Sequence, residues 1–428
     1  ERGYATTFAA IGLGARIVER HITLDKALEG PDHLASLLPA EFESMVRGIR
    51  EISLALGQHS SGRIVSQGEK LNRETLGKSI VAAKNILAGS KISIEDCAIR
   101  SPGRGLSPLR LKELVGRRAH RTVARGDFFY NSDLGDTQPQ SEKCKPVLPF
   151  QCGIPVRFHD FIQFRDIFDV QFVEFHLSYK DMQFFDLNKL ESSSYLEFFV
   201  HAPELFADSH LLDLCSLDQN YRRHSISHLQ KVIDLTRALA AKFPDQSRPP
   251  GIIVNCGGFS SDGPLPENEV NARFDLLVSS FSELDTADVS LLPQTMAPFP
   301  WLLGGQQHQN LFLHPKQIMQ YADALEVNVC FDTSHTALAC KHFGHKLDEY
   351  VELLGDRIAH IHIGDASGLT GEGLQIGEGE IDFGSLLGKL CHNSPKASLL
   401  PEIWQGHKDF GSGFVEAFSR LQALYEQS

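Results

Sequence analysis

The sequence lacks several features that would assign it to a familiar class at once. It has no run of about 18 apolar residues, which excludes a membrane span, and it opens without an apolar signal sequence. Its eight cysteines form no CxxC pair, a usage that suits free thiols in a reducing cytoplasm. It also lacks a P-loop and a dinucleotide fingerprint, because the Gly377–Gly379 stretch has no preceding strand and following helix.

An excess of positive charge is absent as well. Against 54 Asp and Glu residues stand 41 Lys and Arg residues, which gives a net charge of -13. Nucleic-acid binding needs clustered positive charge, so we expect no nucleic-acid partner. The hydrophobic fraction of 42% and charged fraction of 22% are those of a soluble globular protein. A length of 428 residues predicts two or three domains.

The first segment, residues 1–76, has the pattern of an interrupted α/β unit. It predicts a helix over Tyr4–Gly12, a strand over Ala15–Glu19, a loop, and a helix over Ala40–Leu56 between Pro39 and Gly57. A domain rarely begins with a helix that runs straight into a strand, and the chain does not begin with Met. We therefore expect that the sequence is truncated at its start and retains only the closing βα unit of an α/β fold.

The next segment, residues 77–136, alternates short apolar runs (SIVAA, KISI, HRTVA) with turn signals, which predicts a small β-rich domain. It is basic, with eleven Lys and Arg against six Asp and Glu. Two interpretations of this charge remain open: a lid over an anionic ligand, or a solvated face. Residues 137–150 are polar and rich in proline, as linkers are.

Residues 151–428 alternate strands with helices, which predicts a parallel (β/α)8 barrel. The strand candidates are, in order, FVEFHL, LEFFVHA, GIIVNC, VSLLP, NVCFD, IAHIHI and SLLPEI. Chemistry in such barrels lies at the carboxyl ends of the strands. The polar residues found there are His201, Asn255, Gln294, Asp332, His335, His362, Asp365 and Glu402. An Asp, imidazoles and a Glu at one rim predict a divalent-metal site.

These motifs resemble the xylose-isomerase-like barrel family of sugar-phosphate isomerases and epimerases. They are VHAPE on the second predicted strand, Asp332-Thr333-Ser334-His335, the HIGD of His362 to Asp365, IGEGEIDF, and LLPEI. The resemblance implies Mn, Zn or Mg held by Asp332, His362 and Glu402, with His335 and His201 contacting substrate. It also implies that two carboxylates move a proton between adjacent carbons of an open-chain sugar.

The chain departs from that family at two strand ends. Gln294 stands where the family has its first metal-binding and catalytic Glu, and Asn255 stands where many members have a His. Gln can ligate through its carbonyl oxygen but cannot accept a proton. Three interpretations remain open: a metal site with altered chemistry at Gln294 and Glu402, a metal site that only binds sugar, or a degenerate barrel.

The run from Gly14 to Phe42 resembles the end of the barrel in sialic acid (nonulosonate) synthases. Its motifs are Gly14-Ala15, Glu19-Arg20-His21, Thr23-Leu24-Asp25 and Gly30-Pro31-Asp32-His33. The resemblance implies that His21 binds the catalytic Mn and that Asp32 contacts an amino sugar. Residues 78–136 resemble the antifreeze-like (SAF, β-clip) domain of these synthases. That domain places one Arg over a dimer partner's active site, which would be Arg100 or Arg104.

Together the patterns predict the C-terminal portion of a bifunctional nonulosonic acid biosynthesis protein in the cytoplasm. Its partners would be a sugar or sugar phosphate and a second copy of the chain, through the synthase and SAF parts. Phosphoenolpyruvate condensation needs residues of earlier strands, so we expect synthase activity only in a full-length protein. The alternative is a barrel without catalysis that binds sugar or supports the dimer.

Overall fold

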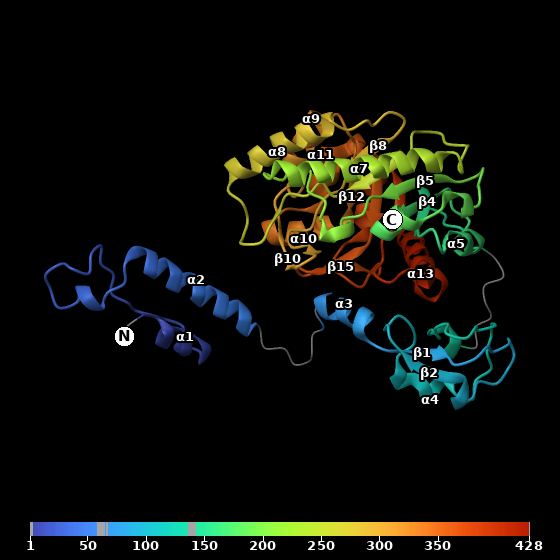
Figure 1. The fold of residues 1–428 in the computed structure, drawn as a ribbon, viewed down its shortest axis with the longest axis horizontal. Coiled ribbons are helices and arrows are strands. Elements are labelled where there is room, and N and C mark those ends of the chain that lie inside the picture. The colour runs from blue at the N-terminus through green and yellow to red at the C-terminus, as the bar shows by residue number, and fades with distance from the viewer. Residues whose placement is uncertain (1–2, 58–64, 66, 136–142, 428) are drawn as a thin grey trace. The chain divides into compact units, whose positions relative to one another are not determined.

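The computed structural model describes residues 3–57, 65, 67–135 and 143–427 of the chain (Figure 1). The chain divides into two compact units, Glu1–Val65 and Ser66–Ser428. Part of the predicted linker, residues 137–142, lies outside the described residues. Within the described part, no helix has the length and hydropathy that crossing a membrane requires.

The first unit contains two α-helices that pack on each other. They are α1 (Ala5–Gly12) and α2 (Pro39–Leu56), with a short 3-10 turn η1 (His33–Ala35) before α2. Both predicted helices are confirmed. Proline at the first position of α2 and Gly57, with φ of 64°, set its two ends.

The predicted strand at Ala15–Glu19 is wrong. This segment has no ladder partner, and the unit's one described bridge joins Ile22 to Leu37. A strand exists only by pairing with a neighbour, and the described residues of this unit include no strand. The apolar character of the segment was therefore insufficient to make a strand.

The small β-rich segment around residues 79–134 has its own core, centred on Ile80, Leu114, Val123 and Phe129. Its strands β1 (Ser79–Ala82) and β2 (Cys97–Arg100) are antiparallel. KISI and HRTVA contribute isolated bridges, Lys91 to Arg118 and Ile86 to Val123, instead of full strands. The remaining elements are α3 (Gln67–Leu76), η2 (Ile94–Asp96), η3 (Pro108–Arg110), α4 (Leu111–Leu114) and η4 (Ser132–Leu134).

The C-terminal region is a parallel eight-stranded sheet that closes into a barrel, as predicted. Its order is β12-β13-β16-β3-β4-β5-β6-β8, and the bridge between Gln294 and Cys330 joins the two ends. The strands are β3 (Gln151–Val156), β4 (Phe172–His176), β5 (Glu197–His201), β6 (Gly251–Val254), β8 (Ser290–Pro293), β12 (Val329–Asp332), β13 (Ile358–Ile363) and β16 (Ser398–Pro401). Alternate side chains fill the interior, with Phe172, Phe199, Ile253, Leu292 and Leu400 forming one cluster.

Sequence analysis missed one barrel strand, β3. β3 carries Gly153 and Pro155, residues that disfavour strand interiors. Both fit here: a Cβ at Gly153 would lie 2.2 Å from the ring of Phe172, and Pro155 lies beyond the two β3 residues that pair with β16. Because β3 comes first, the VHAPE motif lies on the third strand, β5, not the second.

Helices follow most strands and surround the barrel, as Figure 1 shows for α7, α8 and α9. They are α5 (Phe161–Ile167), α6 (Tyr179–Phe184), α7 (Gln219–Ala240), α8 (Glu267–Ser282), α9 (Pro315–Ala324), α10 (Thr333–Phe343), α11 (Leu347–Leu354), α12 (Phe383–Asn393) and α13 (Lys408–Tyr425). Short pieces complete the region: η5 (Leu187–Lys189), η6 (Ala207–Ser209), η7 (Gly355–Arg357), β7 (Phe259–Ser260), β9 (Trp301–Leu302), β10 (Gly305–Gln306), β11 (His308–Gln309), β14 (Asp365–Ser367) and β15 (Gly371–Leu374).

Candidate metal and sugar site

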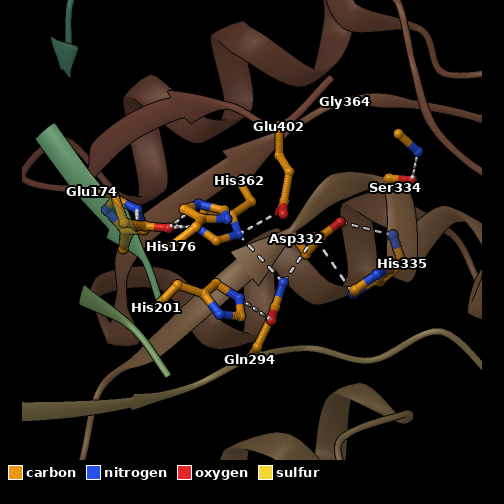
Figure 2. Close-up of polar contacts among 12 residues, drawn as sticks. Glu174, His176, His201, Gln294, Asp332, Ser334, His335, His362, Gly364 and Glu402 are labelled. Carbon is orange, nitrogen blue, oxygen red and sulfur yellow. Dashed lines mark hydrogen bonds and ion pairs between the residues drawn. The ribbon is translucent and has the colours of Figure 1, made fainter. Parts of the chain in front are cut away.

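Four predicted ligands come from four strands that are neighbours in the closed barrel. Gln294 follows β8, Asp332 ends β12, His362 lies in β13, and Glu402 follows β16. Parallel strands end at the same edge, so these side chains converge (Figure 2). Sequence analysis named all four, and the fold brings them together.

The four side chains are within contact distance in series. Gln294 Nε2 lies 2.9 Å from Asp332 Oδ2 and 3.3 Å from His362 Nδ1. His362 Nδ1 lies 2.7 Å from Glu402 Oε2. Asp332, His362 and Gln294 are at most 3% exposed. Imidazole, amide and carboxylate groups therefore meet at a site where only Glu402 is substantially exposed, at 36%.

His201 on β5 adjoins this group, as predicted for a residue at the site. Its Nε2 lies 3.3 Å from Gln294 Oε1, and its Nδ1 lies 3.0 Å from the carbonyl oxygen of Ala202. His201, His362 and Glu402 could hold a metal ion, since one ligand atom from each lies within 4.8 Å of the others. Asn255 behaves differently, because its amide donates a 3.0 Å hydrogen bond to Glu204.

His335 lies beside the group on the first turn of α10. Its backbone N–H donates to Asp332 Oδ1 at 2.8 Å, which caps the helix. Its Nδ1 is 3.1 Å from the carbonyl oxygen of Thr295. Burial disfavours the charged ring, but Asp332, Glu372 and Glu402 outweigh it and raise the pKa of His335 to about 9. His335 is thus a cationic donor at neutral pH.

A buried carboxylate beneath the group was missed by sequence analysis. Glu174 is fully buried in the middle of β4, among three imidazoles. His176 Nε2 and His360 Nε2 each lie 2.8 Å from it, and His362 Nε2 lies 3.1 Å from it. Sequence analysis considered only the strand ends and so missed Glu174. The alternation of Phe172, Glu174 and His176 along β4 is the signal that places Glu174 on the inward face.

The charges of this cluster are coupled. Burial alone would raise the pKa of Glu174, but His362, His176 and His360 lower it well below the usual range. Burial would likewise lower the pKa of His362, yet Cys330, Glu174 and Glu402 raise it well above the usual range. Burial would raise the pKa of Glu402, and His362, His176 and His201 lower it instead. The imidazoles around Glu174 and Glu402 therefore favour the ionised form of both carboxylates.

Asp365, the last residue of the HIGD motif, supports the loop that follows it. Its carboxylate accepts backbone hydrogen bonds from Ala366, Gly377, Gly379 and Ile381, at distances between 2.8 and 3.1 Å. This loop includes the β14–β15 hairpin, which carries Glu372. Asp365 is fully buried, and both of its carboxylate oxygens accept from backbone N–H groups of this loop, so its place is structural.

The residues predicted for the synthase part belong to the first unit and to the β-rich segment around residues 79–134. In the first unit His21 Nδ1 is 3.9 Å from Asp32 Oδ1, with side chains 58% and 71% exposed. They lie close enough to contact one ligand. Arg100 ends β2 and is exposed, and Arg104 is exposed with its Nε 3.9 Å from Glu74 Oε1. Neither arginine is distinguished as the one that serves a synthase site.

Comparison with known families assigns the barrel. The family model described as "Xylose isomerase-like TIM barrel" matches residues 164–423, which is more than half of the chain. The chain belongs to this family. The resemblance inferred from VHAPE, DTSH, HIGD and LLPEI is thereby confirmed.

The other two segments match further models. Residues 1–61 match the NeuB family and residues 77–135 match the SAF domain, which confirms the synthase-like start. The chain is 37% identical over 117 residues to N,N'-diacetyllegionaminic acid synthase of Legionella pneumophila, covering 27% of this chain and 32% of that protein. It is 38% identical over 146 residues to N-acetylneuraminate-9-phosphate synthase of Mus musculus, covering 34% of this chain and 39% of that protein.

The chain thus spans 32% and 39% of the lengths of these two relatives. Among solved structures, the barrel is similar to a D-tagatose 3-epimerase-like protein, with 20% sequence identity and a TM-score of 0.48. That match covers 65% of this chain and 99% of the other.

Proposed function

We propose that the barrel is a divalent-metal-dependent isomerase or epimerase of a sugar or sugar phosphate. The observation that carries this proposal is the convergence of Gln294, Asp332, His362 and Glu402 from four neighbouring strands. Membership of the xylose isomerase-like family supports it.

The donor set fits a hard or borderline divalent ion such as Mn, Zn or Mg, which prefers carboxylate, amide and imidazole ligands. Glu402 Oε2 is buried and, although close to His362, makes no aligned hydrogen bond. Burial and the neighbouring Glu402 raise the pKa of Asp332, although His335 opposes this. A bound cation would stabilise the neighbouring carboxylates of Asp332 and Glu402. It would also give Glu402 Oε2, which has no aligned hydrogen bond, a partner.

Gln294 can take part through its oxygen. His201 Nδ1 faces a carbonyl, so it carries hydrogen, and the neutral ring then accepts at Nε2. The Gln294 amide next to that nitrogen is best matched when its NH2 group faces His201. In that orientation, which exchanges the amide oxygen and nitrogen, the oxygen faces Asp332 and His362. The His201 tautomer therefore favours Gln294 as an oxygen ligand.

The surrounding residues suit proton transfer next to a sugar carbonyl. When bound, the ion would polarise a carbonyl or hydroxyl oxygen of the open-chain sugar. Glu402 supplies a carboxylate at the site (Figure 2) that can accept a proton from carbon. His335 is placed to donate a hydrogen bond to a sugar oxygen. Glu174 accepts from His362 Nε2, which leaves Nδ1 directed at Glu402 and the ligand set.

The test is metal content of the purified full chain by mass spectrometry. We expect near-stoichiometric Mn, Zn or Mg in the wild type and in the exposed control Asp356→Ala. Asp332→Ala should lose the metal. Absence of metal from the wild type would overturn the isomerase proposal.

A second candidate function is a barrel that binds sugar or supports a dimer without catalysis. Gln294 is the observation that favours it, because an amide cannot replace the proton-accepting carboxylate of the family. Binding of sugar without any exchange of its carbon-bound protons would establish this alternative.

We further propose that residues 1–76 and 77–136 are the end of a synthase barrel and its SAF domain, joined through 137–150 to the barrel at 151–428. In a full-length protein His21 would bind metal, and Asp32 with Arg100 would contact an amino sugar. Dimerisation through these parts and a cytoplasmic location belong to the same proposal. The eight cysteines, all unpaired, fit a reducing compartment.

A further inference from the structure

Glu372 is a carboxylate that the proposed chemistry has not yet used. It lies on β15, which pairs antiparallel with β14 directly after barrel strand β13. The hairpin is tied down on both sides of the site: Gly373 N donates to Ser334 Oγ at 2.8 Å, and Trp404 N donates to Gly373 O at 2.6 Å. The backbone that carries Glu372 is therefore fixed between α10 and the segment after β16.

The Glu372 side chain faces the site. Its Oε2 lies 3.6 Å from His335 Nε2, and the side chain is 30% exposed. Burial raises the pKa of Glu372, partly offset by His335 and reinforced by Asp332, Glu204 and Glu402. A partly accessible carboxyl group beside His335 is placed to accept and to release a proton.

Two other carboxylates at this rim already accept hydrogen bonds. Asp332 accepts from His335 N, and Glu204 accepts from Asn255. Among the described residues, none donates a hydrogen bond to the carboxylate of Glu372, whose close charged partner is His335. Glu372 is thus available to a ligand.

We propose that Glu372 supplies the second proton-transferring carboxylate, the role that Gln294 cannot fill. This inference rests on the proposed function. Sequence analysis gave no sign of it, because Glu372 lies in a Gly-rich hairpin and not at the end of a barrel strand.

Glu372 and Glu402 together account for both transfers at carbon, since one group removes a proton and the other returns one. One carboxylate removes the proton from the carbon next to the sugar carbonyl, and the C–H electron pair becomes the double bond of an enediolate. The other carboxyl group returns a proton to carbon. Epimerisation places it on the opposite face of the same carbon. Isomerisation places it on the former carbonyl carbon, while the proton of the neighbouring hydroxyl passes to the former carbonyl oxygen. One proton leaves carbon and one arrives, and exchange with water restores both carboxyl groups.

The test is deuterium incorporation into sugar carbon in D2O, with D-fructose and D-fructose 6-phosphate as probes and full-length chain loaded with Mg, Mn or Zn. We compare wild type, Glu372→Gln and Glu378→Gln. Glu378 is a matched control, because it is an exposed carboxylate of the same loop that pairs with Arg420 at 3.5 Å. We expect Glu372→Gln to slow incorporation by about 10²- to 10⁴-fold, and Glu378→Gln to match wild type.

Metal content and melting temperature of each variant separate the possible failures. Unchanged metal content with slow incorporation in Glu372→Gln supports the proposal. Incorporation at the wild-type rate in Glu372→Gln overturns it while leaving the isomerase function intact. Loss of metal or folding in Glu372→Gln assigns it a structural role and also overturns it. If wild type binds metal but incorporates no deuterium, the proposed function itself fails and the role of Glu372 with it.

Discussion

The side-chain amide nitrogen of Gln294 lies 2.9 Å from Oδ2 of Asp332, in the seam where the barrel closes. A glutamate at position 294 would place a second buried carboxylate at that distance. Like charges this close raise each other's cost of ionisation, unless a cation lies between them.

Gln294→Glu should therefore lower the melting temperature of the metal-free chain, and added metal should raise it by more than in wild type. Calorimetry with and without chelator measures both effects. The activity of this variant separates the two candidate functions: a large gain in isomerase activity indicates a decayed site, and a loss indicates chemistry adapted to Gln294. If added metal raises the melting temperature of wild type and of Gln294→Glu by the same amount, this would count against a cation beside residue 294.

Glu174→Gln should weaken metal binding by about 10- to 100-fold, because the neutral amide orients His362 less firmly than a carboxylate. It also removes the buried carboxylate that pairs with three imidazoles, so we expect the unfolding free energy to fall by roughly 3 kcal/mol. Isothermal titration and chemical denaturation measure the two quantities. The control is Glu191→Gln at an exposed ion pair; wild-type metal affinity in Glu174→Gln would refute the orienting role.

Asp365→Asn should loosen the loop that carries Glu372. The charged oxygens accept four backbone N–H groups, and an amide in the same place both loses charge and presents a donor to them. We expect a loss of about 2–4 kcal/mol in unfolding free energy. Hydrogen exchange of residues 371–381 should accelerate as well. Protection equal to wild type would show that the hairpin is held by other contacts.

The stability of the chain should fall as pH drops from about 6.5 to about 4, in part because of His228 on α7. Burial, with smaller effects from His210, Lys231 and His224, lowers the pKa of His228 to about 4. The unfolded ring then binds a proton at a pH where the folded ring does not, so acid favours unfolding. The ring is partly exposed, and we expect a contribution of about 1–2 kcal/mol.

His228→Gln should accordingly flatten the dependence of melting temperature on pH between 4 and 6.5. His392→Gln, at an exposed histidine, is the control and should leave the slope unchanged. An unchanged slope in His228→Gln would show that the ring is solvated in the folded state.

The sequence by itself determined the features that depend on local chemistry. Pro39 and Gly57 bracket α2 because proline suits the first helical turn and glycine tolerates the positive φ after the last. Polar residues that end apolar runs identified Gln294, Asp332, His362 and Glu402, since parallel strands share one functional edge.

Only the tertiary structure decided which side chains touch across the barrel. His362 and Glu174 are 188 residues apart, and their contact depends on the stagger between strands, which no local pattern records. β3 forms despite Gly153 and Pro155 because its neighbours provide the ladder. Ala15–Glu19 forms no strand, because the described residues of its unit offer no strand to pair with. Burial of Glu174 is stable because three imidazoles surround it, and the Gly373 contacts fix Glu372 at the site. Each of these outcomes depends on contacts with residues that are distant in the sequence.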